Sequence, residues 1–162
     1  MGACAFRGRE VPRRRRRDGC LGQARRLSRG RVRGLATLVD TSAFFALLSQ
    51  SDENHEAAVA VLDQLGSERL VTPNYVVVEV TALVDRRLGR VAVRDLHTRL
   101  LRPVEIAWVD REVHELALSA FLAAPEISLV DRVSVEVMRR LRIGTAFTFD
   151  RDFVRQGFEV VP

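Results

Sequence analysis

Short apolar runs of strand length alternate with amphipathic helical segments along most of this chain of 162 residues. The segment 54–65, for example, has apolar residues at i, i+3, i+4 and i+7, which is typical of a helix with one buried face. Strands that alternate with helices indicate a parallel sheet covered on both faces. We therefore expect an α/β fold with a central, mostly parallel sheet of about four or five short strands.

Turn and cap residues set the expected boundaries. Pro73 opens a helix, Gly89 ends it, and Asp110 caps a later one. The expected strands are 35–40, 69–72, 104–109, 145–149 and 158–161. The expected helices are 42–49, 54–65, 74–88, 91–101, 111–123 and 129–142.

The charge divides the chain into two parts. All 26 basic residues are Arg. Twelve of them lie in residues 1–34 beside only two acidic residues, so this segment has a net charge of +10 and residues 35–162 have −5. A segment with this composition and little to bury is expected to be a disordered basic tail. Two interpretations of it remain open: an arm that holds RNA phosphates by charge, or an over-extended gene start.

Targeting and redox signals are few. The arginine run 13–17 is not followed by the apolar stretch of a secretory signal, and no stretch is long enough to span a membrane. Both cysteines, Cys4 and Cys20, lie in the tail, so the remaining chain has neither a disulfide framework nor a thiolate metal site. We expect a reduced, cytoplasmic protein.

Four acidic residues stand where a carboxylate is costly. Asp40 and Asp150 end apolar runs of strand length, Glu79 interrupts a run of valines in a helix, and Asp131 lies in the first turn of another helix. A carboxylate facing an apolar interior costs several kcal/mol unless it is paired or binds a metal. The carboxyl ends of parallel strands share one edge of the sheet, where ligands gather. The pattern favours a divalent-metal site and metal-assisted phosphodiester chemistry.

Each acid also has a purely structural explanation. Asp40 has the position of a helix N-cap, Asp131 lies in the S-x-x-D start signal formed with Ser128, and Asp150 can begin a turn. Glu79 is the hardest to explain in this way, because valines occupy the same face of its helix. Ser42 and Thr148 place hydroxyl groups beside these acids and suit either metal contacts or capping.

The segments V-D-T-S-A-F around Asp40 and S-L-V-D-R around Asp131, with Glu79 between them, are followed by F-T-F-D-R-D-F around Asp150. Together they resemble the PIN-domain ribonucleases, and most closely the VapC-type toxins of toxin–antitoxin pairs. The resemblance covers essentially all of residues 35–162. It departs from the family in the basic tail and at Arg132, where many relatives have a small or uncharged residue.

This resemblance implies a PIN-like three-layer α/β fold and a divalent-metal-dependent endoribonuclease that acts as the toxin of a type II pair. Mg²⁺ is the implied cofactor, with Mn²⁺ as the alternative. The implied partners are RNA (tRNA, rRNA or mRNA), a small cognate antitoxin and a second copy of the chain, with no membrane. The implied catalytic and metal-binding residues are Asp40, Glu79, Asp131 and Asp150, with Ser42, Thr148 and Asp152 as accessory candidates and Arg86, Arg87 and Arg90 as candidates for RNA contacts.

Two other functions remain open. One is a PIN-domain nuclease of RNA processing without an antitoxin, and the other is a catalytically silent module that binds RNA or protein. Tyr75 and Trp108 are expected to pack against the protein rather than stack on bases, and His55 is expected to have a packing or capping role.

Overall fold

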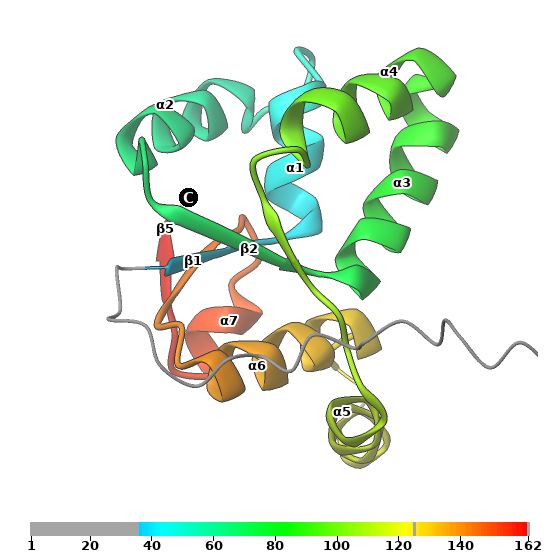
Figure 1. Cartoon of the computed structure of the whole chain (residues 1–162), viewed down its shortest axis with the longest axis vertical. Helices are drawn as coiled ribbons and strands as arrows, with labels where there is room; N and C mark the ends of the chain where they lie inside the picture. Colours follow the sequence, from blue (N-terminus) through cyan, green and yellow to red (C-terminus); the bar gives the residue numbers. More distant parts are fainter. Residues whose placement is uncertain (1–35, 125, 162) are drawn as a thin grey trace, which may run out of the picture. The chain divides into compact units, whose positions relative to one another are not determined.

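The computed structural model describes residues 36–124 and 126–161, so the interpretations of the basic tail lie outside the described residues (Figure 1). Within these ranges, five strands form one parallel sheet in the order β3-β2-β1-β4-β5. The strands are β1 (Ala36–Val39), β2 (Arg69–Pro73), β3 (Glu105–Ala107), β4 (Thr145–Phe147) and β5 (Glu159–Val161).

The helices connect these strands as the alternating pattern predicts. None of the described helices is long and apolar enough to cross a membrane. The described helices are α1 (Thr41–Leu48), α2 (His55–Leu65), α3 (Asn74–Leu88), α4 (Arg90–Asp95), the π-helical turn η1 (Leu96–Leu100), α5 (Arg111–Ala123), α6 (Leu129–Leu141) and α7 (Asp152–Arg155).

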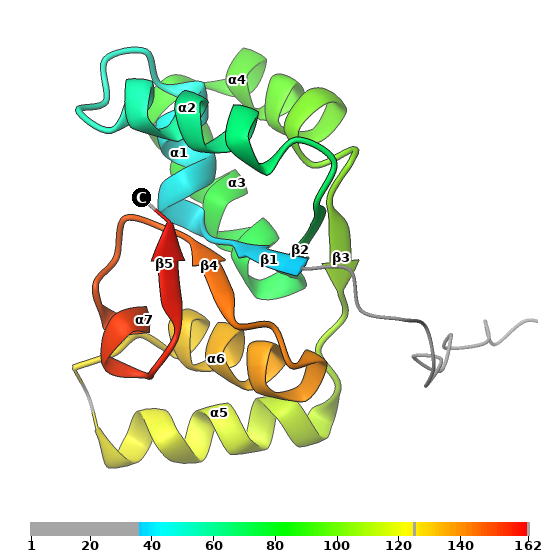
Figure 2. The ribbon, with the colours of Figure 1, turned by 90° about the vertical axis from the view of Figure 1, so that its left-hand side faces the viewer.

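The sheet separates two layers of helices, with α1 to α4 on one side and α5 to α7 on the other (Figure 2). The central strand β1 supplies both layers, because Leu38 packs into the core beneath α5 and α6 whereas Val39 packs into the core of α1 to α4. Both side chains are at most 2% exposed. A strand buried on both faces explains why this run is continuously apolar rather than alternating.

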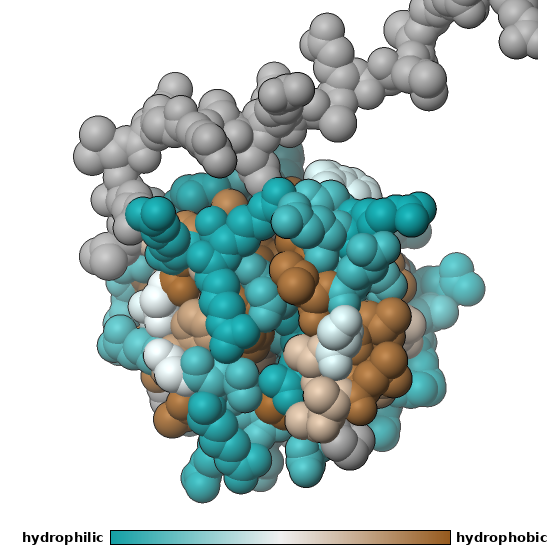
Figure 3. Space-filling view, turned by 90° about the horizontal axis from the view of Figure 1, so that it is seen from below, coloured by the Kyte–Doolittle hydropathy of each residue, from teal (hydrophilic) through white to brown (hydrophobic). Residues whose placement is uncertain are grey.

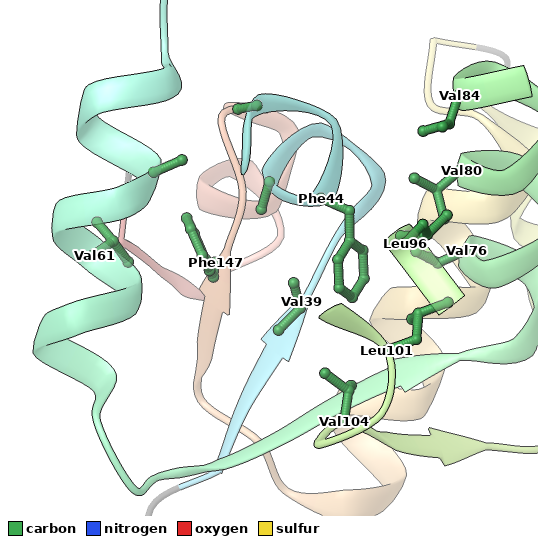
Figure 4. Packing of buried hydrophobic residues seen from close by; sticks show 13 residues of the cluster. Val39, Phe44, Val61, Val76, Val80, Val84, Leu96, Leu101, Val104 and Phe147 are labelled. Carbon is green, nitrogen blue, oxygen red and sulfur yellow. The ribbon is translucent and has the colours of Figure 1, made fainter. Parts of the chain in front are cut away.

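The core between the sheet and α1 to α4, called the first core below, is built around two phenylalanines. Phe44 of α1 and Phe147 of β4 lie on either side of Val39, with valines of α3 completing the cluster (Figure 4). On the opposite layer α5 packs against α6. The outer surface of this layer lies on the face drawn in Figure 3, where hydrophilic side chains surround separate hydrophobic patches.

The predicted elements are confirmed, with local differences. The segment expected as one helix over 91–101 is divided, because the N–H of Leu101 donates to the carbonyl of Leu96 in an i→i+5 bond that widens the last turn. Strand β4 stops at Phe147, two residues early, since Thr148 turns its hydroxyl toward Asp40. The short helix α7 was missed because four residues are too few to show a helical period.

Phe147→Ala should lower the free energy of unfolding by about 3–5 kcal/mol, because a fully buried ring is lost and the cavity refills only partly. Urea unfolding followed by circular dichroism measures this change. The control is Val154→Ala on α7, where the side chain is 56% exposed and the expected loss is within about 0.5 kcal/mol. Equal losses in the two variants would contradict this placement of the core.

Candidate active site at the carboxyl edge of the sheet

Asp40 lies at the junction of β1 and α1 and is 4% exposed. Its backbone is extended, and its side chain caps α1 by accepting from the N–H of Ser42 at 3.4 Å. Its own N–H donates to the carbonyl of Phe147 at 3.1 Å, which continues the pairing between β1 and β4. The cap explanation of Asp40 is therefore correct.

Two hydroxyl groups converge on one oxygen of Asp40. Ser42 Oγ and Thr148 Oγ1 each donate to Asp40 Oδ2 at 3.0 Å. Each hydroxyl also accepts a backbone N–H from the loop after β4, Ser42 from Phe149 and Thr148 from Asp150, both at 3.0 Å. Ser42 and Thr148, two of the three accessory candidates expected from the sequence, thus lie at Asp40 and join the ends of β1 and β4.

The other oxygen of Asp40 is left without a protein partner. Oδ1 is buried and accepts no hydrogen bond from any described residue. Burial raises the pKa of this carboxyl, and the N–H of Thr41 with the donors from Ser42 and Thr148 opposes the rise. An unpartnered buried carboxylate oxygen costs free energy in the absence of a ligand.

Glu79 reaches the same region from α3. Its Oε2 accepts a hydrogen bond from the hydroxyl of Thr41, the residue that follows Asp40. Val76 and Val80, on the inner face of α3, are fully buried in the core between the sheet and α1 to α4. The helix therefore fixes Glu79 beside the start of α1. The sequence analysis did not identify Thr41 as a partner, although its position between Asp40 and Ser42 is a usable signal.

Asp131 lies in the first turn of α6 and forms the predicted start signal with Ser128. Ser128 Oγ accepts from the N–H of Asp131 at 3.1 Å and donates to Asp131 Oδ2 at 2.6 Å. Asp150 follows β4, and its Oδ1 accepts from the N–H of Asp152 at 2.8 Å, which begins the turn into α7. The structural explanations of both acids are therefore correct, and each leaves one carboxylate oxygen outside the turn that it stabilises.

Electrostatics connect the four acids. The pKa of Asp131 is raised from 3.8 to about 6, first by burial and then by the negative charges of Asp40, Asp150 and Glu79, while the hydrogen bond from Ser128 opposes the rise. Residues from β1, α3, α6 and the end of β4 thus share one region of negative potential. In the described part of the chain, no three acidic, His or Cys side chains are already closed around a single point. Like charges repel one another without a cation between them.

The residues fit a hard divalent cation. The donors are carboxylate and hydroxyl oxygens with no nitrogen or sulfur among them, which is the ligand chemistry of Mg²⁺ and Mn²⁺ rather than of zinc. The unpartnered Oδ1 of Asp40 is a donor that the protein itself does not use. The three histidines have other roles in the described chain. His55 Nδ1 bonds to the carbonyl of Ala46, His114 to Tyr75 and His97 to Thr81.

Asp152, the third accessory candidate, is the first residue of α7 and forms an ion pair with Arg155 at 2.7 Å. The guanidinium of Arg132 has no acidic partner within the described residues and donates to Gln156 Oε1 at 3.4 Å. Arg86 and Arg87 are exposed in the last turn of α3. Arg90 instead pairs with Asp85 at 2.8 Å, which weakens its candidacy for a phosphate contact.

The PIN domain profile matches residues 37–159, and the chain belongs to this family. The predicted family, fold and enzyme class, that of a nuclease, are thereby confirmed. PIN-domain nucleases depend in general on a divalent metal, which agrees with the carboxylate donors at this edge of the sheet.

The chain is 35% identical over 131 residues to the 23S rRNA-specific endonuclease VapC20 of Mycobacterium tuberculosis, covering 76% of this chain and 97% of that protein. The crystal structure of that VapC20, described as a sarcin–ricin loop cleaving toxin, superposes with a TM-score of 0.71 and 32% identity over 78% of this chain and 99% of VapC20.

Two more distant structures share the fold. FitAcB of Neisseria gonorrhoeae has a TM-score of 0.61 at 20% identity and covers 78% of this chain and 96% of its own. VapBC2 of Rickettsia felis, bound to a DNA fragment from its promoter, has a TM-score of 0.56 at 11% identity, with coverages of 78% and 97%.

Asp131→Asn should stabilise the metal-free protein at neutral pH, by roughly 3–6 °C in melting temperature for about 1 kcal/mol after allowing for solvent screening. A carboxyl whose pKa rises on folding contributes most to the free energy of unfolding below about pH 3.8. This contribution is lost as the pH rises through about 6. The gain should therefore be present at pH 7.5 and vanish near pH 4. Thermal melts in EDTA across this range measure it, with Asp152→Asn as the control. A gain that is independent of pH would contradict the shared negative field.

Proposed function

We propose that this protein is a divalent-metal-dependent endoribonuclease, with residues 35–162 as its nuclease domain and Asp40, Glu79, Asp131 and Asp150 as its catalytic acids. The observation that carries the proposal is the buried Oδ1 of Asp40, which no described residue uses, beside a Glu79 that Thr41 holds in place. The pKa of Asp131, raised first by burial and then by the charges of the other three acids, supports the same grouping. Four carboxylates that share one field have a strong electrostatic reason to bind a cation. Family membership supports the same activity.

Mg²⁺ is the proposed cofactor, held by these four residues. Bound there, a divalent cation lowers the pKa of a water molecule and neutralises charge on the transferred phosphoryl group. The donor set supports Mg²⁺, and Mn²⁺ is expected to substitute because it accepts the same oxygen ligands.

The chain's own residues hold this site in shape. Ser42 and Thr148 fix one oxygen of Asp40, so its free oxygen has a defined direction. Thr41 does the same for Glu79, and Ser128 for Asp131. Such supporting contacts keep ligands within the narrow tolerance that catalysis demands. Arg86 and Arg87, exposed at the end of α3, are proposed to contact RNA phosphates.

The proposed substrate is a structured ribosomal RNA stem-loop. Its support is VapC20, a 23S rRNA-specific endonuclease that this chain matches over 97% of the length of VapC20. The description of VapC20 as a sarcin–ricin loop cleaving toxin makes an RNA hairpin with that loop sequence the natural first substrate.

Purified protein should cut this hairpin in Mg²⁺ and not in EDTA. Asp131→Asn and Asp150→Asn should each lower kcat by at least about 100-fold, because each removes a ligand charge from the phosphoryl-transfer site. Denaturing gels with end-labelled RNA measure the rate, and Glu115→Gln, at an exposed acid of α5, is the control. Asp131→Asn is especially informative, since the variant expected to be more stable without metal is also expected to be inactive.

Different failures have different meanings. Equal cleavage by Asp131→Asn and the unaltered protein would remove this residue from the catalytic set. Failure of the hairpin to be cut, with metal-dependent cutting of other RNA, would replace the substrate but keep the activity. Folded protein that neither binds Mg²⁺ nor cuts any RNA would favour a silent binding module.

We further propose that the chain is the toxin of a type II pair, acts in the cytoplasm as a homodimer and is neutralised by a small antitoxin. Its likeness to the VapC20 toxin supports this role. Induced expression should then arrest bacterial growth, and co-expression of a small protein encoded beside it should restore growth. The Asp150→Asn variant should not arrest growth. Growth arrest without a neighbouring rescuing gene would instead favour an RNA-processing nuclease.

A further inference from the structure

Trp108 is the single tryptophan of the chain, and its side chain is 77% exposed. The prediction that Trp108 packs against the protein is therefore wrong. Tyr75, in contrast, is partly buried against the core beneath α5 and α6, and its hydroxyl forms a hydrogen bond with His114 at 2.8 Å, as expected. A large aromatic ring left in water at a fixed position is available to bind a partner, because aromatic rings contribute strongly to interfaces.

The strand register places Trp108 near the catalytic acids. Leu38 pairs with Val71, and Pro73 pairs with Ala107, so the continuation of β1 to Asp40 lies level with Pro73 and Ala107. Trp108 is the next residue after Ala107. It therefore leaves the same carboxyl edge of the sheet as Asp40, two strands away, at about 10 Å for strands spaced 4.8 Å apart.

The backbone on either side of Trp108 is held firmly. The N–H of Val109 donates to Asn74 Oδ1 at 3.0 Å, which ties this turn to the start of α3. Asp110 accepts from the N–H of Val113 at 3.0 Å as the cap of α5, and pairs with Arg140 of α6 at 2.9 Å. A ring on a fixed backbone loses little conformational entropy when it binds a partner.

We propose that Trp108 stacks on an unpaired base of the RNA beside the cleavage point, and thereby makes the enzyme prefer loops over duplex. This inference rests on the proposed function. Indole rings stack on any base, because every base has a π-face, whereas a base inside a duplex already stacks on its neighbours. Trp108 selects the single-stranded state of the RNA and leaves the choice of sequence to other contacts.

A protein partner is the competing occupant, and the surroundings of Trp108 in the chain favour RNA. Ala107 is buried and Val109 is half-buried, while Asp110 and Arg111 are charged and exposed. Trp108 is therefore a single exposed ring in its segment, whereas protein interfaces use contiguous apolar patches. A single ring beside a phosphodiester-cleaving site suits one base.

The kinetic experiment compares Trp108→Ala with Trp108→Phe in the full chain, on the sarcin–ricin hairpin and on a fully paired duplex of the same sequence. Trp108→Ala should raise KM for the hairpin by roughly 5- to 150-fold, the range expected when one stacked base is lost, with little change in kcat. Trp108→Phe should restore most of the loss. The preference for hairpin over duplex should fall in Trp108→Ala.

Leu122→Ala is the matched control. Leu122 is 72% exposed near the other end of α5, about 17 Å further along the helix at 1.5 Å per residue, so it tests whether losing any exposed apolar side chain has the same effect. Its KM should equal that of the unaltered protein. Unchanged KM in Trp108→Ala, with normal cleavage by the unaltered protein, would overturn this inference and leave the proposed function intact. Absence of metal-dependent cleavage by the unaltered protein would overturn both.

Tryptophan fluorescence gives a second readout, because all tryptophan emission comes from this residue. Hairpin RNA added in EDTA should quench the emission in parallel with binding measured on filters. Bound RNA without a change in emission would overturn the inference. An emission change that follows protein concentration alone, before RNA is added, would overturn it in favour of a second copy of the chain covering Trp108.

Discussion

The buried carboxylate of Asp40 is the interaction on which the site depends. Asp40 follows the central strand and caps the first helix. Its carboxylate accepts hydrogen bonds from two hydroxyl groups, that of Ser42 on α1 and that of Thr148 after β4. These contacts satisfy one of its oxygens and leave the other buried without a partner. The same side chain therefore joins two neighbouring strand ends and provides the most desolvated acid of the site.

The parallel sheet explains how the remaining acids meet Asp40. Parallel strands deliver all their carboxyl ends to one edge, so β1 and β4 place Asp40 and Asp150 near each other although they are far apart in the sequence. The inner face of α3 brings Glu79 to that edge, and the first turn of α6 brings Asp131 there. Burial first, and then the negative charges that converge at this edge, raise the pKa of Asp131. Bringing four acidic side chains to one edge costs stability when no cation lies between them.

Much of this arrangement could be predicted from the sequence. The helix over 74–88 is correct at both ends because Pro73 and Gly89 mark them, and the alternating pattern gives the sheet. The pairing of Thr41 with Glu79 and the exposure of Trp108 could not be predicted, since both depend on how distant segments pack. The π-turn at Leu96–Leu100 and the four-residue helix α7 lack a periodic signal of their own. The sequence also presented capping and ligation as alternatives for Asp40 and Asp131, whereas one carboxylate oxygen can cap while the other remains free.

The two roles of Asp40 have a consequence for how such a chain would lose its activity under selection. A substitution at position 40 removes the acceptor that joins β1 to β4, so it would reduce the amount of folded protein together with its chemistry. A substitution at Asp131 removes a charge that opposes folding, so the inactive product would persist in the cell. Under the proposed function, survivors of the first kind would lack the protein, whereas survivors of the second kind would retain an abundant inactive copy that still occupies the proposed partners of the active one.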